Sequence, residues 1–428
     1  MTSNQWARIR DGVIGNFQPL VSPGIKPATG MIKLTDEHAE VTFMASDHHL
    51  DDQLLPTDCR AVFGETQAGD VLLLSIAQRG ASLGGLSTAR YRSRCVVLDP
   101  EANEVNDDTV LAVQLHYYGL TGWSGERRLN DEPIIEAGFV VGWTAELRWD
   151  DGKEIPLGDG FMLKFSTGHT VAGSYDRRTL TAPLLVTIES EERRPISEHL
   201  TRLDAVHALL AVAHRATPLA SGGGVRFAKT QNGYCALWER TMISLDPPGD
   251  VTHEFPYLEL DNVGGMEGVA RWIRLALEHR RAVEPLVRHV LFPNQSPESR
   301  ILSTAAAMEY WVGSNARSAS WAKKKAGEDL PAALTHHVDS AWKSWIGDSV
   351  QWVKDFWNAY LDLKHFRADT PDPSTVHSLE VSGRWLLTAA LLDHCTESTK
   401  TSSHLFSSGL GRLGRDLRQE LWGSSAQG

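Results

Sequence analysis

The segment Trp352–Pro373 reads WVKDFWNAYLDLKHFRADTPDP, and it decides how the C-terminal part of the chain is interpreted. Apolar residues at steps of three and four predict a helix with one apolar face, at about 100° of rotation per residue. Asn358, Asp362 and His365 fall on the opposite face, and a Pro-interrupted loop follows. Because the unperturbed pKa of histidine lies near neutrality, a His at a helix end beside an amide and basic residues can move protons at physiological pH. His365 is therefore the first candidate catalytic residue.

The rest of the C-terminal part carries the same helical periodicity. The segments predicted to be helical are Gly265–Phe292, Glu298–Gly313, Thr335–Phe366 and Ser378–His394. Nine of the 14 tryptophans lie from Met266 onward. At helical spacing, tryptophans are typical of packing, so we expect a helical bundle with a bulky aromatic core.

The N-terminal part is composed of short β-branched or aromatic segments bounded by Gly, Pro, Asp or Asn, which predict strands. The predicted strands lie within residues 30–44, 59–64, 70–78, 90–99, 109–119 and 182–191. A helix is expected at about 197–214, the SGGG at Ser221–Gly224 predicts a loop, and strands return at 225–230 and 235–245. Strands at such short spacing favour an antiparallel sandwich or barrel.

We therefore predict an α+β protein of two domains. Residues 1–256 are expected to form an antiparallel β-rich sandwich or barrel with an inserted helix, and residues 257–428 an all-α bundle. A chain of 428 residues is long for one hydrophobic core, which agrees with this division.

Charge and cysteine content restrict the class of protein. Residues 1–264 contain 23 basic and 36 acidic residues, whereas residues 265–428 contain 19 basic and 18 acidic ones. Only the C-terminal part is therefore free electrostatically to approach a phosphate backbone. The four cysteines show no CxxC spacing, no run of about 18 apolar residues occurs, and the N-terminus lacks the apolar core of a signal peptide. We expect a cytoplasmic protein with no membrane partner.

Several motifs follow one another along the chain. In the N-terminal part these are GNF at Gly15–Phe17, GMIKLTDEHAEVTF, CRAVFGETQAGDVLLLSI and STARYRSRCVVLDPEANEVNDDTVLAVQLHYYGLTGW. In the C-terminal part they are AAAMEYWVG, and NAYLDLKHFRADTPDPS followed by GRWLLTAALLDH. In sequence and in order these motifs resemble the ApeA-like antiphage proteins, which join an ApeA N-terminal domain to a C-terminal HEPN domain. The resemblance implies that Glu309 is buried.

This resemblance implies antiviral defence by abortive infection, with metal-independent RNA cleavage as the effector step and no cofactor. HEPN ribonucleases typically carry an Arg, often followed by a polar residue such as Asn, and a His a few residues later. On that pattern His365 is the general acid or base and Asn358 orients it or the phosphate. The positions that the family's spacing allows for the Arg are Asn358, Ala359 and Tyr360, and none of them is an Arg; the residue before Asn358 is Trp357. Lys364 or Arg367 is therefore expected to supply the cation.

The resemblance also implies partners. HEPN domains dimerise to bring two motifs into one cleft, so we expect a homodimer, with RNA as the substrate and a phage-derived trigger. The densest basic run, Lys323, Lys324 and Lys325, is expected in a loop between helices, where it either contacts RNA phosphates or is simply solvated.

Three further motifs are better explained by ordinary structure than by a functional site. GLGRLG at Gly409–Gly414 fits GxGxxG, but no strand precedes it, so we expect a flexible linker into a short terminal helix. SDHHLDDQ at Ser46–Gln53 is expected to be an exposed polar loop with no metal, because adjacent His residues on a strand point to opposite faces. DPEANEVNDD at Asp99–Asp108 lacks the Gly of an EF-hand and predicts an acidic hairpin loop.

Two other functions compete with the nuclease. The missing Arg favours a catalytically inactive HEPN module that senses, binds or dimerises. A carbohydrate-binding sandwich is supported only by an aromatic group, namely Tyr117, Tyr118, Trp123, Trp143 and Trp149.

Overall fold

The computed structural model places two compact units along the chain. Unit 1 comprises residues 1–121, 126–204 and 218–252, and unit 2 comprises residues 122–125, 205–217 and 253–428. The described residues are 2–20, 27–35, 38–46, 59–82, 86–101, 105, 107–125, 129–147, 152–174, 177–228, 233–246, 256–291, 294–338, 340–365, 372–396 and 400–423.

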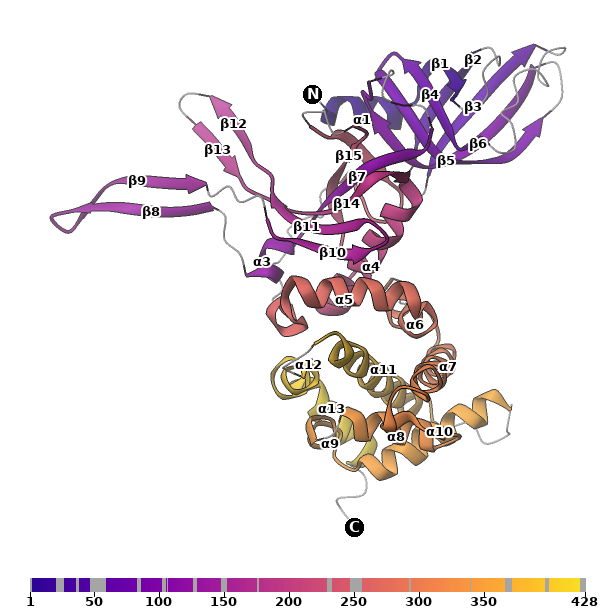
Figure 1. Ribbon diagram of the computed structural model, residues 1–428, viewed down its shortest axis with the longest axis vertical. Coiled ribbons are helices and arrows are strands. Elements are labelled where there is room, and N and C mark those ends of the chain that lie inside the picture. Colours follow the sequence, from indigo (N-terminus) through magenta and orange to yellow (C-terminus); the bar gives the residue numbers. More distant parts are fainter. Residues whose placement is uncertain are drawn as a thin grey trace. The chain divides into compact units, whose positions relative to one another are not determined.

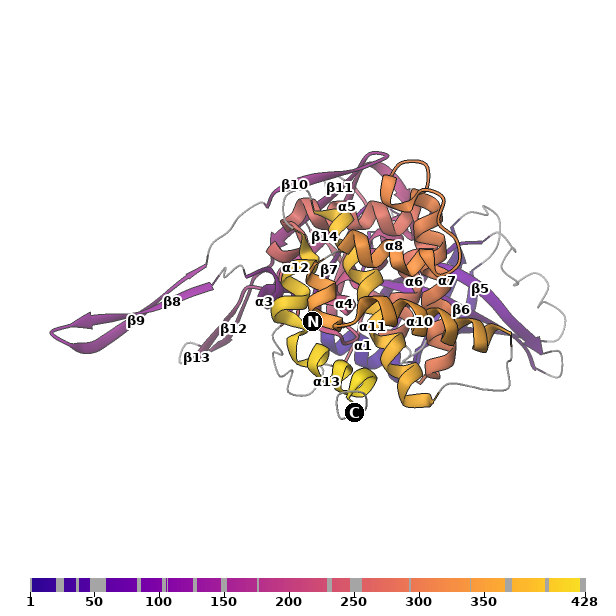
Figure 2. The ribbon, with the colours of Figure 1, turned by 90° about the horizontal axis from the view of Figure 1, so that it is seen from below.

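Unit 1 begins with helix α1 (Thr2–Asp11) and continues into an antiparallel barrel (Figures 1 and 2). Its strands are β1 (Val13–Pro19), β2 (Ala28–Leu34), β3 (Ala39–Ser46), β4 (Ala61–Thr66), β5 (Gly69–Ser82) and β6 (Leu86–Leu98). They follow the order β6-β3-β2-β1-β4-β5, and β5 pairs again with β6, which closes the ring.

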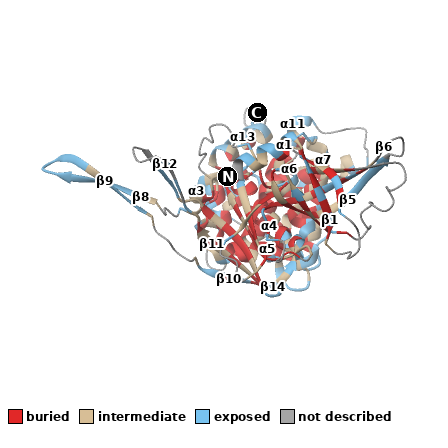
Figure 3. Ribbon diagram, turned by 90° about the horizontal axis from the view of Figure 1, so that it is seen from above, coloured by how far each residue is buried: buried red, intermediate tan, exposed pale blue. Residues whose placement is uncertain are grey.

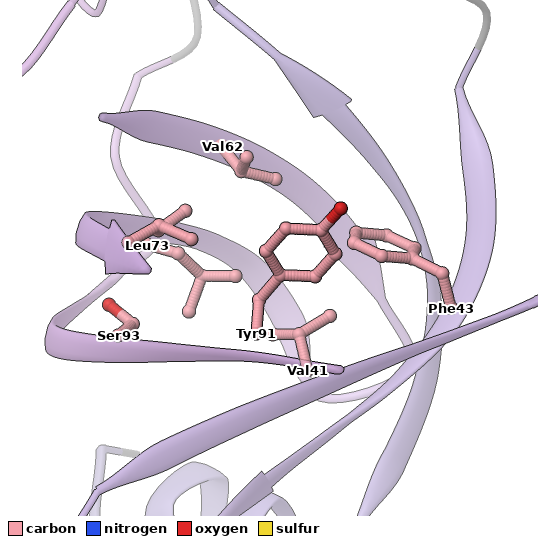
Figure 4. A pocket seen from close by; sticks show the side chains of 7 residues that line it. Val41, Phe43, Val62, Leu73, Tyr91 and Ser93 are labelled. Atoms are coloured by element: carbon pink, nitrogen blue, oxygen red, sulfur yellow. The ribbon is translucent and has the colours of Figure 1, made fainter. Parts of the chain in front are cut away.

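The barrel interior is filled by side chains. Inward and outward positions alternate along β1, as expected for a strand with one buried face (Figure 3). The rings of Phe17 and Phe43 meet edge to face at 5.8 Å, and those of Phe43 and Tyr91 at 5.5 Å. Figure 4 shows this interior, which leaves no room for a water molecule. Gly64 is required here because a Cβ at its position would lie 2.6 Å from the Phe17 ring.

The same sheet extends beyond the barrel in the order β10-β11-β14-β7-β15-β16-β6. These strands are β7 (Thr109–Tyr117), β10 (Glu154–Gly158), β11 (Phe161–Thr167), β14 (Leu184–Pro195), β15 (Ala220–Arg226) and β16 (Cys235–Glu239). Every pairing is antiparallel, which confirms the predicted antiparallel β-rich part. Helix α4 (Ile196–His214) occupies the predicted helical segment and contributes residues to both units.

Two short ribbons pair with no other described strand. One consists of β8 (Leu129–Glu136) and β9 (Phe139–Leu147), and the other of β12 (Thr170–Ser174) and β13 (Arg177–Thr181). The short helix α3 (Leu120–Ser124) precedes the first of them.

The prediction of a loop at Ser221–Gly224 is wrong, because these residues lie within strand β15. A Cβ at Gly223 would lie 2.7 Å from a methyl carbon of Leu115, and one at Gly224 would lie 2.7 Å from the Cβ of Tyr234. The glycines therefore permit the close approach of neighbouring side chains within the sheet.

Unit 2 contains the predicted all-α part. Its described helices are α5 (Gly265–Glu278), α6 (Arg280–Leu291), α7 (Pro297–Asn315), α8 (Asp329–Val338), α9 (Ser340–Ile346), α10 (Ser349–Lys364), α11 (Pro373–Cys395), α12 (Thr401–His404) and α13 (Gly411–Trp422), with short turns η1 (Asp261–Val263), η2 (Ser320–Ala322) and η3 (Leu405–Gly409). Helix α11 contacts α5, α7, α8, α10, α12 and α13. It is buried on nearly every side, as expected of a central helix.

Two of the predicted helices are divided. The segment Thr335–Phe366 breaks at Gly347, whose φ of 87° lies in the left-handed region that ends helices. Asp348 then caps α10 by accepting hydrogen bonds from the backbone N–H groups of Val350 and Gln351. The segment Gly265–Phe292 breaks at His279, between α5 and α6.

The predicted flexible linker at Gly409–Gly414 is also wrong. Gly409 ends the π-helical turn η3, and Gly411 and Gly414 lie in helix α13. A Cβ at Gly414 would lie 2.4 Å from the indole nitrogen of Trp345, so this glycine allows α13 to pack closely on α9. The Trp345 indole N–H donates to the carbonyl oxygen of Leu410 at 2.8 Å.

The predicted aromatic core is confirmed. The buried tryptophans of the helical part are Trp272, Trp311, Trp342, Trp345, Trp352, Trp357 and Trp385. No helix among the described residues combines the length and apolar character that crossing a membrane requires.

Candidate functional site on helix α10

Helix α10 presents Asn358 and His365 of the predicted polar face to solvent, whereas Asp362 is only partly exposed. Its buried face is formed by Trp352, Val353, Phe356, Trp357, Ala359 and Tyr360. Asn358 is exposed on the other side, and the helix ends at His365, whose backbone N–H donates to the carbonyl oxygen of Leu361 at 3.0 Å. The local cause of this arrangement is the spacing of the apolar residues, which fixes the face that packs on α11 and α7.

The exposed imidazole of His365 makes no hydrogen bond or ion pair with any described residue. Asn358 is likewise exposed, one and a half to two turns earlier on the helix. The structure thus leaves both side chains available to a ligand. Arg367 lies outside the described residues.

Lys364 is exposed but already engaged. Its Nζ donates to the hydroxyl oxygen of Tyr360 at 2.8 Å, and this hydrogen bond raises the pKa of Lys364 above its ordinary value. The Tyr360 hydroxyl in turn donates to Oε1 of Glu309 at 3.3 Å. A role for Lys364 in binding phosphate would require this hydrogen bond to open or to be shared.

The expectation that Glu309 is buried is wrong, because its side chain is partly exposed beside Tyr360. Among the described glutamates of the bundle, Glu380 on α11 is fully buried. Its Oε1 lies 3.2 Å from Nε of Arg384 and 3.8 Å from Nε2 of His289. Nε2 of His289 also lies 3.3 Å from the hydroxyl oxygen of Thr304.

Burial controls the charge of this cluster. Desolvation raises the pKa of Glu380, against the attraction of Arg384 and Arg300. Desolvation lowers the pKa of His289 to about 3, and the nearby guanidinium groups of Arg384 and Arg300 act in the same direction. His289 is therefore neutral at pH 7. Because Glu380 and His289 are inaccessible to solvent, we interpret the cluster as part of the core and not as a reactive site.

The predicted basic run lies between helical segments. Lys323 follows η2, and Lys323, Lys324 and Lys325 are all exposed. Lys323 and Lys325 border a surface hollow of about 410 Å³. The other residues lining it are Ser320, Trp321, Ala332, Ala333 and His336. The hollow thus combines two cations with an indole and an imidazole.

Trp321 and His336 line this hollow, although neither was predicted as a site residue from the sequence. The indole of Trp321 stacks on the ring of His337, with centroids 4.4 Å apart and planes 20° apart. The signal was available, since Trp321 comes two residues before the basic run, and proteins that bind single-stranded nucleic acid combine aromatic with basic side chains. The loop also approaches α10, because a Cβ at Gly327 would lie 4.0 Å from the indole nitrogen of Trp357.

The remaining candidates are weaker. Tyr117 and Trp123 are completely buried, and Trp149 lies outside the described residues, so the aromatic group suggested for carbohydrate binding does not form a surface. Ser46 aside, the SDHHLDDQ motif lies outside the described residues, as do parts of DPEANEVNDD. Among the residues that are described, no three side chains converge in a way that could hold a metal ion.

Among the described residues of unit 1, a hollow of about 230 Å³ lies next to β16. Arg10 and Asp246 pair across it, with Nη1 donating to Oδ1 at 2.8 Å. Behind it, the buried carboxylate of Glu239 accepts hydrogen bonds from Nε of Arg94 at 2.5 Å and from the backbone N–H groups of Thr241 and Met242 at 2.8 and 2.9 Å. These polar groups are paired within the protein, which is typical of a structural arrangement.

The fold and site together define a two-part protein, with an antiparallel β barrel and extended sheet in one part and an all-α bundle bearing an exposed histidine in the other. The chain belongs to the ApeA family: residues 13–242, just over half of its length, match the domain described as ApeA N-terminal domain 1. This is a family of antiphage defence proteins. Comparison with curated proteins and with solved structures found no match.

Proposed function

We propose that this antiphage protein acts as a metal-independent ribonuclease of the HEPN type, which cleaves RNA when a phage-derived component triggers it. The observation that carries the proposal is the exposed imidazole of His365 at the end of α10, which makes no hydrogen bond or ion pair with any described residue and lies on the same helix as the exposed Asn358. The membership of the N-terminal part in the ApeA family supports the role in defence.

The chemistry requires only proton transfer and a bound phosphate. The imidazole of His365 takes the proton from a ribose 2′-hydroxyl, the 2′-oxygen attacks phosphorus, and the bond from phosphorus to the 5′-oxygen breaks. The leaving 5′-oxygen takes up a proton, and the products are a 2′,3′-cyclic phosphate and a 5′-hydroxyl. Asn358 holds the phosphate or orients the imidazole. A homodimer supplies a second imidazole to protonate the leaving oxygen.

The basic hollow gives the RNA a place to bind. Lys323 and Lys325 neutralise backbone phosphates, and the Trp321 indole offers a face on which a base stacks. To test this role, RNA affinity is measured for Lys323→Glu/Lys325→Glu beside Lys324→Glu, which changes one equally exposed lysine that does not border the hollow. We expect the double variant to bind roughly tenfold or more weakly and with a reduced salt dependence. Equal losses of RNA affinity in both variants would argue that the hollow is not the specific RNA-binding site.

The competing function is that of an inactive HEPN module that senses, binds or dimerises. A specific observation favours it: Asn358, Ala359 and Tyr360, the positions that the HEPN spacing allows for the Arg, hold no Arg. The residue before them, Trp357, is a buried indole whose ring centroid lies 4.9 Å from that of Tyr360, so it supplies no cation either.

Induced expression in a bacterial host, with and without phage, distinguishes the two functions. Wild type, His365→Ala and the control Gln351→Ala, an exposed residue in the first turn of α10, are compared for growth and for integrity of total RNA. The nuclease proposal requires RNA loss with wild type and the control but not with His365→Ala. Intact RNA in all three, even during phage challenge, supports the inactive module.

A further inference from the structure

The paired barrel strands β5 and β6 carry only positive charge within an acidic part of the chain (Figure 1). Residues 71–98, which cover nearly all of both strands, contain four arginines and no Lys, Asp or Glu, whereas residues 1–264 contain 23 basic and 36 acidic residues. Arg94 is engaged in the protein, because its Nε donates to Oε1 of Glu239 at 2.5 Å. The other three are Arg79, Arg90 and Arg92.

Arg90 and Arg92 point outward from the barrel. Ala89 and Tyr91, which alternate with them along β6, are 0% and 3% exposed and fill the interior. Arg90 and Arg92 are exposed, and their guanidinium groups make no hydrogen bond or ion pair with any described residue. Two residues along a strand separate their Cα atoms by about 6.6 Å. The outer side of β6 therefore presents a short row of available cations.

The residues beside this row leave it open. Arg90 lies between Thr42 of β3 and Gly80 of β5. A Cβ at Gly80 would meet no atom within 4 Å, so the space next to Arg90 is free of described side chains. Arg79 is the extra residue of a β-bulge just before Gly80, and it is exposed as well. We call Arg79, Arg90 and Arg92 the basic face.

The neighbouring charges leave the basic face positive. Glu40 of β3 pairs with Arg92, so its carboxylate lies on the same side of the sheet. Lys33 of β2 pairs with Glu40 from the other side and is exposed. The two charges compensate each other, and the three arginines remain in excess.

We propose that the basic face binds the phosphate backbone of a DNA duplex. Protein–DNA interfaces are polar and strongly positive, whereas the centres of protein–protein interfaces are enriched in aromatic residues and Met. No large apolar side chain is exposed among the described residues of β5 and β6. The exposed neighbours of the arginines are small or polar, namely Ala77, Gln78, Gly80 and Ala81. This composition favours a nucleic acid over an acidic protein surface.

The same residues favour a DNA duplex over RNA or a single strand. Single strands are bound by stacking their bases on aromatic side chains, and Tyr91 points into the barrel. Duplex RNA is contacted over about 16 base pairs and two successive minor grooves, which is far longer than this row of arginines. A DNA duplex carries one charge per about 1.7 Å of its axis, so even a short row meets several phosphates. The contact involves unit 1 alone, and it stands or falls separately from RNA cleavage by His365.

Fluorescence anisotropy of a labelled short DNA duplex, titrated with the full chain at several salt concentrations, tests the contact. Arg90→Glu/Arg92→Glu reverses two charges of the basic face. Arg8→Glu/Arg194→Glu is the matched control, because it reverses two exposed arginines of α1 and β14. We expect the first variant to bind at least about tenfold more weakly, with a salt slope smaller by about 2, and the control to stay within about threefold of wild type.

Circular dichroism checks that each variant is folded, and Arg90→Gln/Arg92→Gln replaces the charge reversal if it is not. Lys323→Glu/Lys325→Glu, in the hollow of unit 2, is expected to leave DNA binding within about threefold of wild type. Four results would overturn the proposal: no binding of the duplex at physiological salt, equal losses in the control, loss through the lysines of the hollow instead, or arginine-dependent binding that is tighter for duplex RNA or polyglutamate than for DNA.

Discussion

The buried pair of Glu380 and Arg384 gives a sharp test of the packing of the helical part. Glu380→Gln keeps the shape of the side chain but removes its charge. Arg384, whose side chain is 14% exposed, is then left without a counter-ion 3.2 Å away. Breaking a buried pair from one side costs about 3–5 kcal/mol, because the remaining charge stays desolvated and uncompensated.

Urea unfolding, followed by tryptophan fluorescence, measures this loss in the free energy of unfolding. Nine of the 14 tryptophans lie in the helical part, and Trp385 directly follows Arg384. With an m-value of about 2 kcal/mol/M, a loss of 4 kcal/mol moves the midpoint of the helical transition by about 2 M urea. Arg384→Met is expected to cause a comparable shift, and Glu380→Leu/Arg384→Met together much less than the sum of the two single losses.

A control comes from an exposed pair in the same unit. Glu284 and Arg288 on α6 lie 2.6 Å apart, but their side chains are 36% and 58% exposed. Glu284→Gln is expected to cost less than about 0.5 kcal/mol. The reasoning is refuted if Glu380→Gln shifts the midpoint no further than Glu284→Gln, or if the losses at Glu380 and Arg384 simply add.

Three further predictions concern stability. Glu239→Gln removes the charge on a buried carboxylate that accepts hydrogen bonds from Arg94 and two backbone N–H groups, and it should destabilise unit 1 by about 2–4 kcal/mol in urea unfolding. Gly64→Ala places a methyl group 2.6 Å from the Phe17 ring and should cost about 1–3 kcal/mol, whereas Gly80→Ala, with no atom within 4 Å, should cost far less. Burial lowers the pKa of His289 to about 3, below the unfolded value of about 6.5. The unfolded chain therefore binds more protons between these values, and the stability of the helical part should fall as pH drops from about 6.5 toward 3, by at most about 1.4 kcal/mol per pH unit.

For each of these three predictions, one result would contradict the reasoning. A Glu239→Gln protein as stable as wild type would mean that the buried carboxylate is dispensable. Equal effects at Gly64 and Gly80 would mean that the barrel interior tolerates an added methyl group. For His289, the acid-dependent loss of stability should be smaller in His289→Gln, and an unchanged slope would assign the acid sensitivity to other groups.

The spacing of apolar residues was enough to predict much of the helical part. Helix α11 was expected at Ser378–His394 and runs from Pro373 to Cys395. Its early start follows from Asp372, which caps the helix, and from Pro373, whose missing N–H is tolerated in the first turn. Prolines around this position predict a loop by composition, but Pro373 instead begins the helix, where Pro is common.

Features that depend on partners distant in the sequence were not predictable. The SGGG stretch resembles a loop until Leu115 and Tyr234 show that only glycine fits between the neighbouring side chains. Likewise, periodicity gives no indication that Glu380 would be buried and Glu309 partly exposed, because burial of a charge depends on Arg384 and His289 lying beside it. The hollow beside Trp321 forms only when α8 packs against η2.

The proposed function requires that the exposed imidazole of His365 cleave RNA without a metal. Purified wild type and His365→Ala are incubated with total RNA from phage-infected and uninfected cells, with and without EDTA, and the ends of the fragments are determined. We expect fragments ending in 2′,3′-cyclic phosphate and 5′-hydroxyl groups, formed by wild type in EDTA and absent with His365→Ala. Cleavage that EDTA abolishes, or that His365→Ala performs as well as wild type, would contradict it.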